Sequence, residues 1–255
     1  MTTPLKDQIV LITGSSRGLG LAIARAFHAE GAKVILNYLQ PSSEKAASSA
    51  ASELSAIAIR ADITDLTVVQ SLFTQAEQHY GQPISIVVNN ALSPFTFNGE
   101  ARPKLEDITW DAFDAQFKGA VQGALNTTKA ALPGFEKLGY GRIINIGSNL
   151  VQNPVVPYQD YTTAKGALLA FTRTCAAELG PKGVTVNMVS GGLLSVTDAS
   201  RGTPEEVFEM VRGVTPLRRV TTPEEMAGAV LFFASPWGRA VTGQNVCVDG
   251  GLVMS

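Results

Sequence analysis

The sequence predicts a doubly wound α/β fold, in which helices cover both faces of one parallel sheet. Short runs of apolar, often β-branched residues recur along the chain, and the stretches between them are long enough for crossover helices. Runs such as Ile84–Val88 are largely apolar, as expected of strands buried on both faces. A glycine-rich turn follows the first run and leads into a helical pattern over Leu19–Glu30, which Gly31 ends.

We expect seven strands joined by right-handed crossovers. The expected strands are Ile9–Ile12, Lys33–Asn37, Ala56–Ala61, Ile84–Asn89, Arg142–Ile146, Val184–Val189 and Asn245–Val248. No repeat, low-complexity tract or Pro/Ser-rich linker interrupts the alternation, so residues 1–255 are expected to form one domain. The one long irregular region, Ser190–Pro216, follows a strand at the sheet edge where ligands bind. It is predicted to be a substrate lid, with an inert surface loop as the alternative.

The composition indicates which classes of ligand this protein can bind. Twenty basic and 22 acidic residues give a net charge of −2 without a long run of either sign, which argues against nucleic acid or an anionic membrane as the ligand. No segment approaches the about 18 unbroken apolar residues of a membrane span, and Met1–Gln8 lacks the pattern of a signal peptide. We expect a soluble, cytoplasmic protein with small-molecule ligands. Cys175 and Cys247 are predicted to be buried thiols, and His28 and His79 lack companions at metal-ligand spacing, so no metal is predicted.

The glycine turn is the first candidate site. Gly14, Gly18 and Gly20 lie between the first strand and the first helix. Missing side chains there let the backbone approach a pyrophosphate, and the helix N-terminus adds N–H donors and positive potential. The spacing differs from GxGxxG, but its position after the first strand of an alternating fold predicts a dinucleotide site rather than a simple packing turn.

Three further residues form a candidate catalytic group. Tyr161 and Lys165 are four apart in the helical pattern Tyr161–Leu179, so their side chains share one face. The lysine ammonium would favour the phenolate and lower the tyrosine pKa, while Ser148, at the end of a strand, would hydrogen-bond the same substrate oxygen. Such a group suits proton exchange at a carbonyl oxygen as hydride moves to or from a nicotinamide.

These residues, with several others, resemble the short-chain dehydrogenase/reductase family. The matching motifs occur in the family's order across nearly the whole chain: Thr13–Gly20 as TGxxxGxG, Asp62-Ile63, Asn89-Asn90-Ala91, Ser148, Tyr161 with Lys165, Val241–Gln244 and Asp249–Gly251. The resemblance implies a Rossmann fold. It also implies that Asp62 and Ile63 lie against adenine, that Asn89 and Ala91 lie near the ribose, and that the Leu194 backbone lies near the nicotinamide amide.

Charge near the glycine turn predicts which dinucleotide binds. An acidic residue about 20 positions after the turn would bind the ribose 2′-hydroxyl of NAD, but Tyr38 stands there. Arg17 lies inside the turn, where it could meet the 2′-phosphate of NADP, and Asn37 adds a neutral polar group. NADP(H) is therefore favoured and NAD(H) remains the alternative. The predicted cofactor contacts are Gly14, Ser16, Arg17, Gly18, Leu19, Gly20, Asn37, Tyr38, Asp62, Ile63, Asn89, Ala91, Tyr161, Lys165 and Leu194.

Two positions depart from the family pattern. Ala120 stands where the family usually has an asparagine that serves a proton relay, so turnover is expected to be weaker unless Lys118, Gln122 or a rearranged water chain substitutes. Ser190-Gly191-Gly192 replaces the usual Pro-Gly pair after the sixth strand. The loss of proline predicts a more mobile lid hinge, or merely a glycine that tolerates the same turn.

The resemblance is greatest to the 3-oxoacyl-acyl-carrier-protein reductase branch, which implies a 3-oxoacyl thioester as substrate. Reductases of sugars, steroids and small ketones share the motifs, and a non-catalytic dinucleotide sensor is the alternative from another class. Phe95-Thr96-Phe97 could line the pocket or pack beneath a loop, and Asp198 could contact substrate or be solvated. The resemblance further implies a homotetramer formed through Asp107–Lys137, Tyr161–Leu179 and the C-terminal strand. Candidate carrier-binding residues are Arg102, Lys104, Arg212, Arg218 and Arg219.

Overall fold

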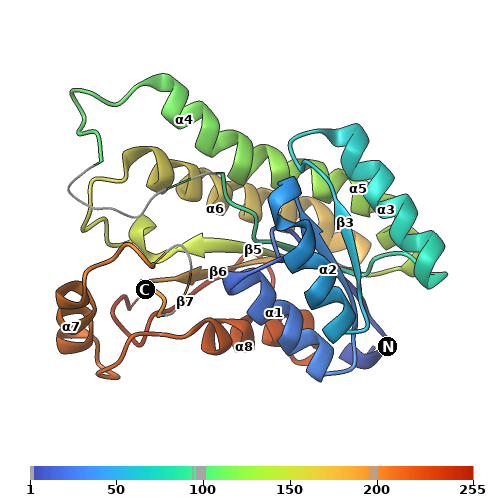
Figure 1. Cartoon of the computed structure of the whole chain (residues 1–255). Helices are drawn as coiled ribbons and strands as arrows, with labels where there is room; N and C mark the ends of the chain where they lie inside the picture. Colours follow the sequence, from blue (N-terminus) through green and yellow to red (C-terminus); the bar gives the residue numbers. More distant parts are fainter. Residues whose placement is uncertain (1–2, 94, 96–101, 196, 198–199, 255) are drawn as a thin grey trace.

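The computed structural model describes residues 3–93, 95, 102–195, 197 and 200–254. It shows one parallel sheet between two layers of helices, as Figure 1 shows. The strand order is β3-β2-β1-β4-β5-β6-β7, which confirms the predicted seven-stranded doubly wound fold. The strands are β1 Ile9–Ile12, β2 Lys33–Tyr38, β3 Ile57–Arg60, β4 Ile86–Asn89, β5 Gly141–Ser148, β6 Val184–Gly191 and β7 Asn245–Val248.

Alternate side chains of the strands build a core on each face of the sheet, because successive residues of a strand point to opposite faces. Val10 and Ile12 of β1 pack into a cluster that includes Phe27 and Phe233. Ile9 and Leu11 of the same strand pack into the opposite cluster. The first cluster lies beneath the helices α1 Gly18–Ala29, α2 Glu44–Glu53 and α8 Pro223–Ala234. The second lies beneath α3 Leu66–Tyr80, α5 Gly123–Leu138 and α6 Gln159–Leu179.

The remaining helical segments are α4 Trp110–Phe117, the π-helical segment η4 Lys118–Gln122 and α7 Glu205–Val214. The described residues also form short 3-10 segments: η1 Leu5–Asp7, η2 Pro41–Ser43, η5 Asn149–Val151, η6 Gly180–Lys182 and η7 Pro236–Gly238. The helix expected over Asp107–Lys137 therefore begins at Trp110 and contains a π-helical interruption before α5. Within the described ranges, no helix has the length and apolar character needed to cross a bilayer.

The predicted ends of β5 and β6 are too early. The two strands stay paired as far as Ser148 and Gly191, so Ser190 belongs to β6 rather than to the lid. Both cysteines are half-buried free thiols rather than fully buried ones, and burial raises the pKa of each thiol to about 11. Cys247 is half-buried because β7 is an edge strand, whereas Cys175 on α6 packs against the margin of the second core cluster.

The region after β6 contains α7. Main-chain contacts join the start of this region to the segment just before α8. Leu194 pairs with Thr221 in a parallel bridge, and the Ser195 N–H donates to Thr221 O at 3.0 Å. A Cβ added at Gly192 would lie 2.9 Å from Asn149 Nδ2, and one at Gly191 would lie 2.8 Å from Met226 Sδ. Close packing therefore explains both glycines, in keeping with the alternative that glycine merely tolerates the same turn.

Candidate active site

The glycine turn is shaped by close backbone approach. Gly14 adopts φ +63°, a left-handed conformation, and a Cβ there would lie 2.9 Å from Ala91 Cα. A Cβ on Gly20 would lie 2.5 Å from Gly14 O and 2.7 Å from Asn90 Nδ2. The helix α1 starts at Gly18, and its N-cap residue Arg17 makes no side-chain cap. The first-turn N–H groups of α1 are thus left to face an anion.

Hydrogen bonds tie this turn to the end of β4. Thr13 Oγ1 accepts from the N–H groups of Asn90 at 3.0 Å and Ala91 at 2.9 Å. Asn90 Nδ2 donates back to Thr13 O at 2.9 Å and to Gly14 O at 3.1 Å. Thr13 and Asn90 were not among the predicted site residues, although both stand in the quoted motifs. Their role is to hold the turn in shape, which sequence spacing alone does not show.

Two predicted cofactor contacts have their side chains occupied within the protein. Asn37 Oδ1 accepts from the Gly14 N–H at 3.2 Å, while its Nδ2 donates to Ala61 O at 3.0 Å. Asn89 Nδ2 donates to Asn145 Oδ1 at 2.8 Å, and Asn89 Oδ1 accepts from Thr127 Oγ1 at 2.6 Å. Both amides therefore brace strand ends. A contact between Asn89 and the ribose would come through its backbone.

The other predicted cofactor contacts lie in the turn after β1 and the start of α1, at the end of β2, and in the loops after β3, β4 and β6. Asp62 Oδ1 accepts from the Thr64 N–H at 2.9 Å and from Thr64 Oγ1 at 2.7 Å, which shapes the loop after β3. The next residue, Ile63, is held by Asn126, whose Nδ2 donates to Ile63 O at 2.9 Å. Tyr38 is buried and ends β2, whereas Arg17 is exposed. Of the remainder, Ser16 is buried, and Leu19, Ala91 and Leu194 are half-buried.

The structure brings the three predicted catalytic residues together. Ser148 ends β5, and Tyr161 and Lys165 lie one turn apart on α6; all three side chains are buried. Ser148 is hydrogen-bonded to Tyr161, and Lys165 Nζ lies 5.7 Å from the centre of the Tyr161 ring. Lys165 Nζ also donates to Ile146 O at 2.7 Å, which anchors the lysine to β5. The group can present a hydroxyl pair to one oxygen atom, with a cation behind it.

Burial dominates the acid–base chemistry of this group in the protein alone. Desolvation raises the pKa of Tyr161 to about 12, Tyr158 adds to the rise, and the Ser148 hydrogen bond opposes it. Desolvation also lowers the pKa of Lys165 to about 8. The predicted lowering of the Tyr161 pKa by Lys165 is therefore not the largest effect here. The net change in the Tyr161 pKa is upward, and burial is its largest cause.

Removal of the buried ammonium should stabilise the protein near neutral pH. The folded pKa of Lys165, about 8, lies below its ordinary value of 10.5, so folding disfavours the charged form below pH 8. This difference corresponds to about 3 kcal/mol, and the lost hydrogen bond to Ile146 O offsets about 1 kcal/mol of it. We expect Lys165→Met to raise the free energy of unfolding by about 2 kcal/mol at pH 7. The gain should shrink as the pH rises above 8 and should be gone by pH 10.5.

Urea unfolding at pH 7 and above pH 10 measures this effect. Lys129→Met, which changes an exposed lysine of α5, is the matched control and should show no comparable pH-dependent gain. Destabilisation by Lys165→Met at both pH values would contradict the assigned cost of burying the ammonium.

The expected substitutes for the missing asparagine point elsewhere. Ala120 is buried in η4, whereas Lys118 forms a surface ion pair with Asp114 at 2.5 Å. Gln122 Nε2 donates to Thr64 O at 3.1 Å, beside the loop after β3. Neither residue takes the asparagine's place in this structure. Gln116, one turn before Ala120, is buried, and its Oε1 has no hydrogen-bond partner within the described part of the chain.

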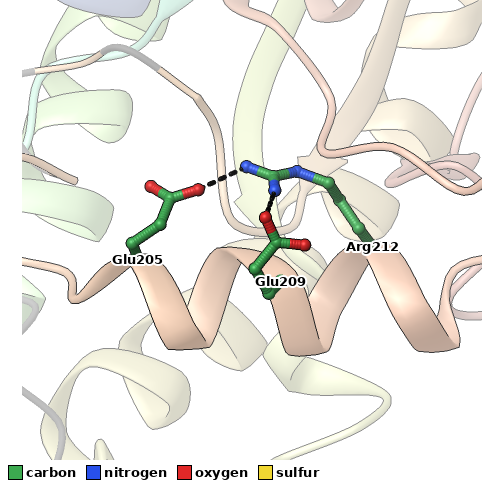
Figure 2. A network of polar contacts seen from close by, with 3 residues as sticks. All are labelled: Glu205, Glu209 and Arg212. Carbon is green, nitrogen blue, oxygen red and sulfur yellow. Dashed lines mark hydrogen bonds and ion pairs between the residues drawn. The ribbon is translucent and has the colours of Figure 1, made fainter.

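The candidate carrier-binding arginines do not form a free cationic patch. Arg212 bridges Glu205 and Glu209 on α7 (Figure 2). Arg219 Nη1 lies 2.5 Å from Glu225 Oε1, and Arg102 Nη2 lies 2.5 Å from Asp160 Oδ2. Arg218 donates to the Gly213 carbonyl, and Lys104 is exposed. Carboxylates thus neutralise three of the five predicted residues.

Phe95 is the member of the predicted aromatic cluster that the structure describes. Its ring lies 4.8 Å from the Tyr161 ring and 5.1 Å from the Tyr158 ring, centre to centre. Thr96, Phe97 and Asp198 lie outside the described residues. In the described ranges no group of three or more His, Cys, Asp and Glu side chains is arranged to hold a metal ion.

Comparison with known proteins agrees with this geometry. Residues 14–253 match a family described as enoyl-(acyl carrier protein) reductase. A 3-oxoacyl-[acyl-carrier-protein] reductase from Pseudomonas aeruginosa is 37% identical over 98% of this chain and 99% of its own length. The corresponding Synechocystis protein is 36% identical over 99% of both chains.

Two solved structures share the whole fold. A blue fluorescent protein from a metagenomic library, in complex with NADPH, superposes with a TM-score of 0.86 at 33% identity, covering 99% of this chain and 100% of the other. A variant of a short-chain dehydrogenase/reductase from Serratia marcescens superposes with a TM-score of 0.84 at 29% identity, covering 98% and 99%. With its glycine turn, its Ser148–Tyr161–Lys165 group and its full-length relatives, this chain belongs to the short-chain dehydrogenase/reductase family of oxidoreductases.

Proposed function

We propose that this protein reduces a ketone with NADPH, reversibly, and that its preferred ketone is a 3-oxoacyl thioester. The observation that carries the proposal is the buried Ser148–Tyr161 hydrogen bond with Lys165 one helical turn away. The names of the Pseudomonas and Synechocystis relatives support the thioester, and the NADPH complex of the metagenomic protein supports the cofactor.

The residues of the glycine turn fit a dinucleotide. Gly14 and Gly20 leave a surface that side chains would fill, and the first turn of α1 presents its N–H groups there. When bound, the nicotinamide supplies or accepts hydride at the carbonyl carbon. The exposed Arg17 can hydrogen-bond the 2′-phosphate of NADP. Position 38 holds a neutral tyrosine rather than an acidic residue that would repel this phosphate.

The three catalytic side chains divide the proton chemistry. Ser148 holds the substrate oxygen, and Tyr161 donates its phenolic proton to that oxygen as the carbonyl is reduced. Lys165, anchored to Ile146 O, places a positive charge behind the phenolate that results. In the reverse direction Tyr161 takes the proton from the alcohol. The surrounding burial keeps water from competing for this proton.

The substrate class is tested by following NADPH oxidation with four compounds. These are an acetoacetyl thioester of a carrier protein, the same acyl group on a small thiol, a simple ketone and a keto sugar. Fastest turnover with either thioester supports the proposal. Preference for the ketone or the sugar would favour the alternative substrates. The ion pairs of Arg102, Arg212 and Arg219 with carboxylates also favour these alternatives, because they leave less positive charge for a carrier protein. Tight NADPH binding without turnover of any carbonyl would identify a dinucleotide sensor.

Arg17 is expected to set the preference between the two dinucleotides. A charge-assisted hydrogen bond contributes about 1.5–3 kcal/mol, so Arg17→Ala should raise the KM for NADPH by about tenfold or more. The KM for NADH should change little, because NADH lacks the 2′-phosphate. Arg25→Ala, which breaks the exposed ion pair with Glu53, is the control on the same helix. An equal rise for both dinucleotides would show that Arg17 does not read the phosphate.

We also propose that the protein forms a homotetramer. Two surfaces support this: β7 is an edge strand whose Val246 is 42% exposed, and α5 carries Leu125 at 36% exposure. Exposed apolar side chains beside an unpaired strand edge are suited to pairing with another copy. Light scattering on the purified protein measures the mass directly, and a monomer would overturn the proposal.

A further inference from the structure

A buried acidic residue stands directly before the catalytic tyrosine. The side chain of Asp160, in the first turn of α6, is 3% exposed. Its Oδ2 lies 2.5 Å from Nη2 of Arg102, whose side chain is 16% exposed. This ion pair is shielded from water, unlike the pairs of Arg25 and Lys118, whose side chains are more than half exposed. Charges held in such surroundings act strongly on neighbouring ionisable groups.

Arg102 also contacts the aromatic ring that packs against Tyr161. Its guanidinium carbon lies 4.2 Å from the centre of the Phe95 ring. The Phe95 ring lies 4.8 Å from the Tyr161 ring, tilted by 32°. Arg102, Phe95 and Tyr161 therefore form a stack, and a guanidinium over an aromatic face is attracted by it. One arginine thus contacts the residue before Tyr161 and the ring that covers Tyr161.

The side chains around Tyr161 determine how easily its hydroxyl loses a proton. Ser148 of β5 hydrogen-bonds the tyrosine, and Tyr158 and Lys165 approach it from α6. Phe95 covers the ring from the segment after β4. Asp160 adds a carboxylate that would oppose formation of the phenolate, since like charges in a buried site repel. The ion pair with Arg102 cancels that carboxylate.

Arg102 and Asp160 do not form the two parallel hydrogen bonds that an arginine and a carboxylate can make. A guanidinium and a carboxylate frequently pair through two parallel hydrogen bonds. Here a single contact joins them, and both Arg102 Nε and Asp160 Oδ1 are buried without partners among the described residues. Unmet buried polar atoms are costly, so their retention beside a catalytic residue suggests a functional reason.

We propose that Arg102 is a positioning residue for Tyr161: it holds Phe95 against the tyrosine ring and cancels the charge of Asp160, so that Tyr161 gives up its proton at a lower pH than it would beside an unpaired carboxylate. This proposal rests on the proposed function, because it concerns the same tyrosine. It replaces the role in carrier binding that we predicted for Arg102. The arginine lies inside the site, with its charge already occupied.

The test is a charge-cancellation series on the whole enzyme. Oxidation of a 3-hydroxybutyryl thioester with NADP⁺ is followed across pH for the wild type, Arg102→Met, Asp160→Asn and the double variant. Arg102→Met keeps an unbranched, flexible side chain but shortens it and removes its charge. It should move the pH of half-maximal kcat upward by about one unit and lower kcat at pH 7 about tenfold. In the double variant no buried carboxylate remains, so the profile should return close to that of the wild type.

Two further variants complete the series. Arg102→Lys keeps the positive charge and should keep the wild-type profile, and it also serves if Arg102→Met does not fold. Arg25→Met, at an exposed ion pair on α1, should leave the profile unchanged. An upward shift of equal size in Arg102→Met and the double variant, or no shift in either, would overturn the proposal. A wild type that oxidises no alcohol would instead overturn the proposed function, and this inference with it.

Discussion

Replacing Tyr161 with phenylalanine is expected to lower kcat for ketone reduction by about 10²- to 10⁴-fold, the range that a positioned general acid contributes. The variant loses only the hydroxyl, which is hydrogen-bonded to Ser148 and lies one helical turn from Lys165. The ring would keep its packing against Phe95, so the pocket should keep its shape. Because the glycine turn is untouched, the dissociation constant for NADPH should change little. Stopped-flow reduction and a fluorescence titration with NADPH separate the two effects.

A matched control removes a different phenolic hydroxyl. Tyr80 OH donates to Val34 O at 2.8 Å, far along the sheet from the catalytic group, at the end of α3. Tyr80→Phe should cost about 0.5–1.5 kcal/mol of stability for that hydrogen bond but leave kcat unchanged. If Tyr161→Phe retained more than a tenth of the wild-type kcat, Tyr161 would not be the principal proton donor.

Replacing Gly20 with alanine is expected to be the most damaging change for cofactor binding. The new Cβ would lie 2.5 Å from Gly14 O and 2.8 Å from Ser15 Cα, both parts of the backbone that cannot move aside freely. The turn must therefore shift, which breaks its fit to a pyrophosphate. We expect NADPH affinity to fall about 100-fold or more and the free energy of unfolding to fall by about 1–3 kcal/mol, a typical cost of overpacking. Calorimetric titration and urea unfolding measure the two quantities.

Gly228→Ala is the matched control for that substitution. Gly228 also lies in a helix, α8, but a Cβ there meets nothing within 4 Å. This variant should bind NADPH normally and gain up to about 1 kcal/mol of stability from helix propensity. Equal loss of NADPH affinity in both variants would contradict the steric account, whereas normal binding by Gly20→Ala would show that the turn adapts.

That Ser148, Tyr161 and Lys165 lie together was predictable, because the signals for these residues are local or strictly ordered along the chain. The spacing of Tyr161 and Lys165 places both on one face of a helix wherever that helix packs, and the glycine turn requires only the chain around it. Local signals do not reveal contacts between distant segments, and this explains the predictions that were wrong. Sequence spacing suggested Lys118 and Gln122 as substitutes for the missing asparagine, but the π-helical turn of η4 and its surface partners direct them away. The sequence predicts Arg102 as a carrier-binding candidate because its partner Asp160, 58 residues away, cannot be recognised from spacing.

The seven strands, the alternation with helices and the glycine turn follow from hydrophobic periodicity and local backbone preference, so the sequence alone was enough to predict them. The ends of β5 and β6 were not predictable, since a strand buried on both faces shows no polar alternation where it stops. Tertiary structure alone decided that the Asn37 and Asn89 amides brace the sheet edge and that burial outweighs Lys165 in the acidity of Tyr161. It alone also placed Arg102 against Phe95 and Asp160. Each of these depends on contacts between segments distant in sequence, and desolvation exists only once those segments have packed together.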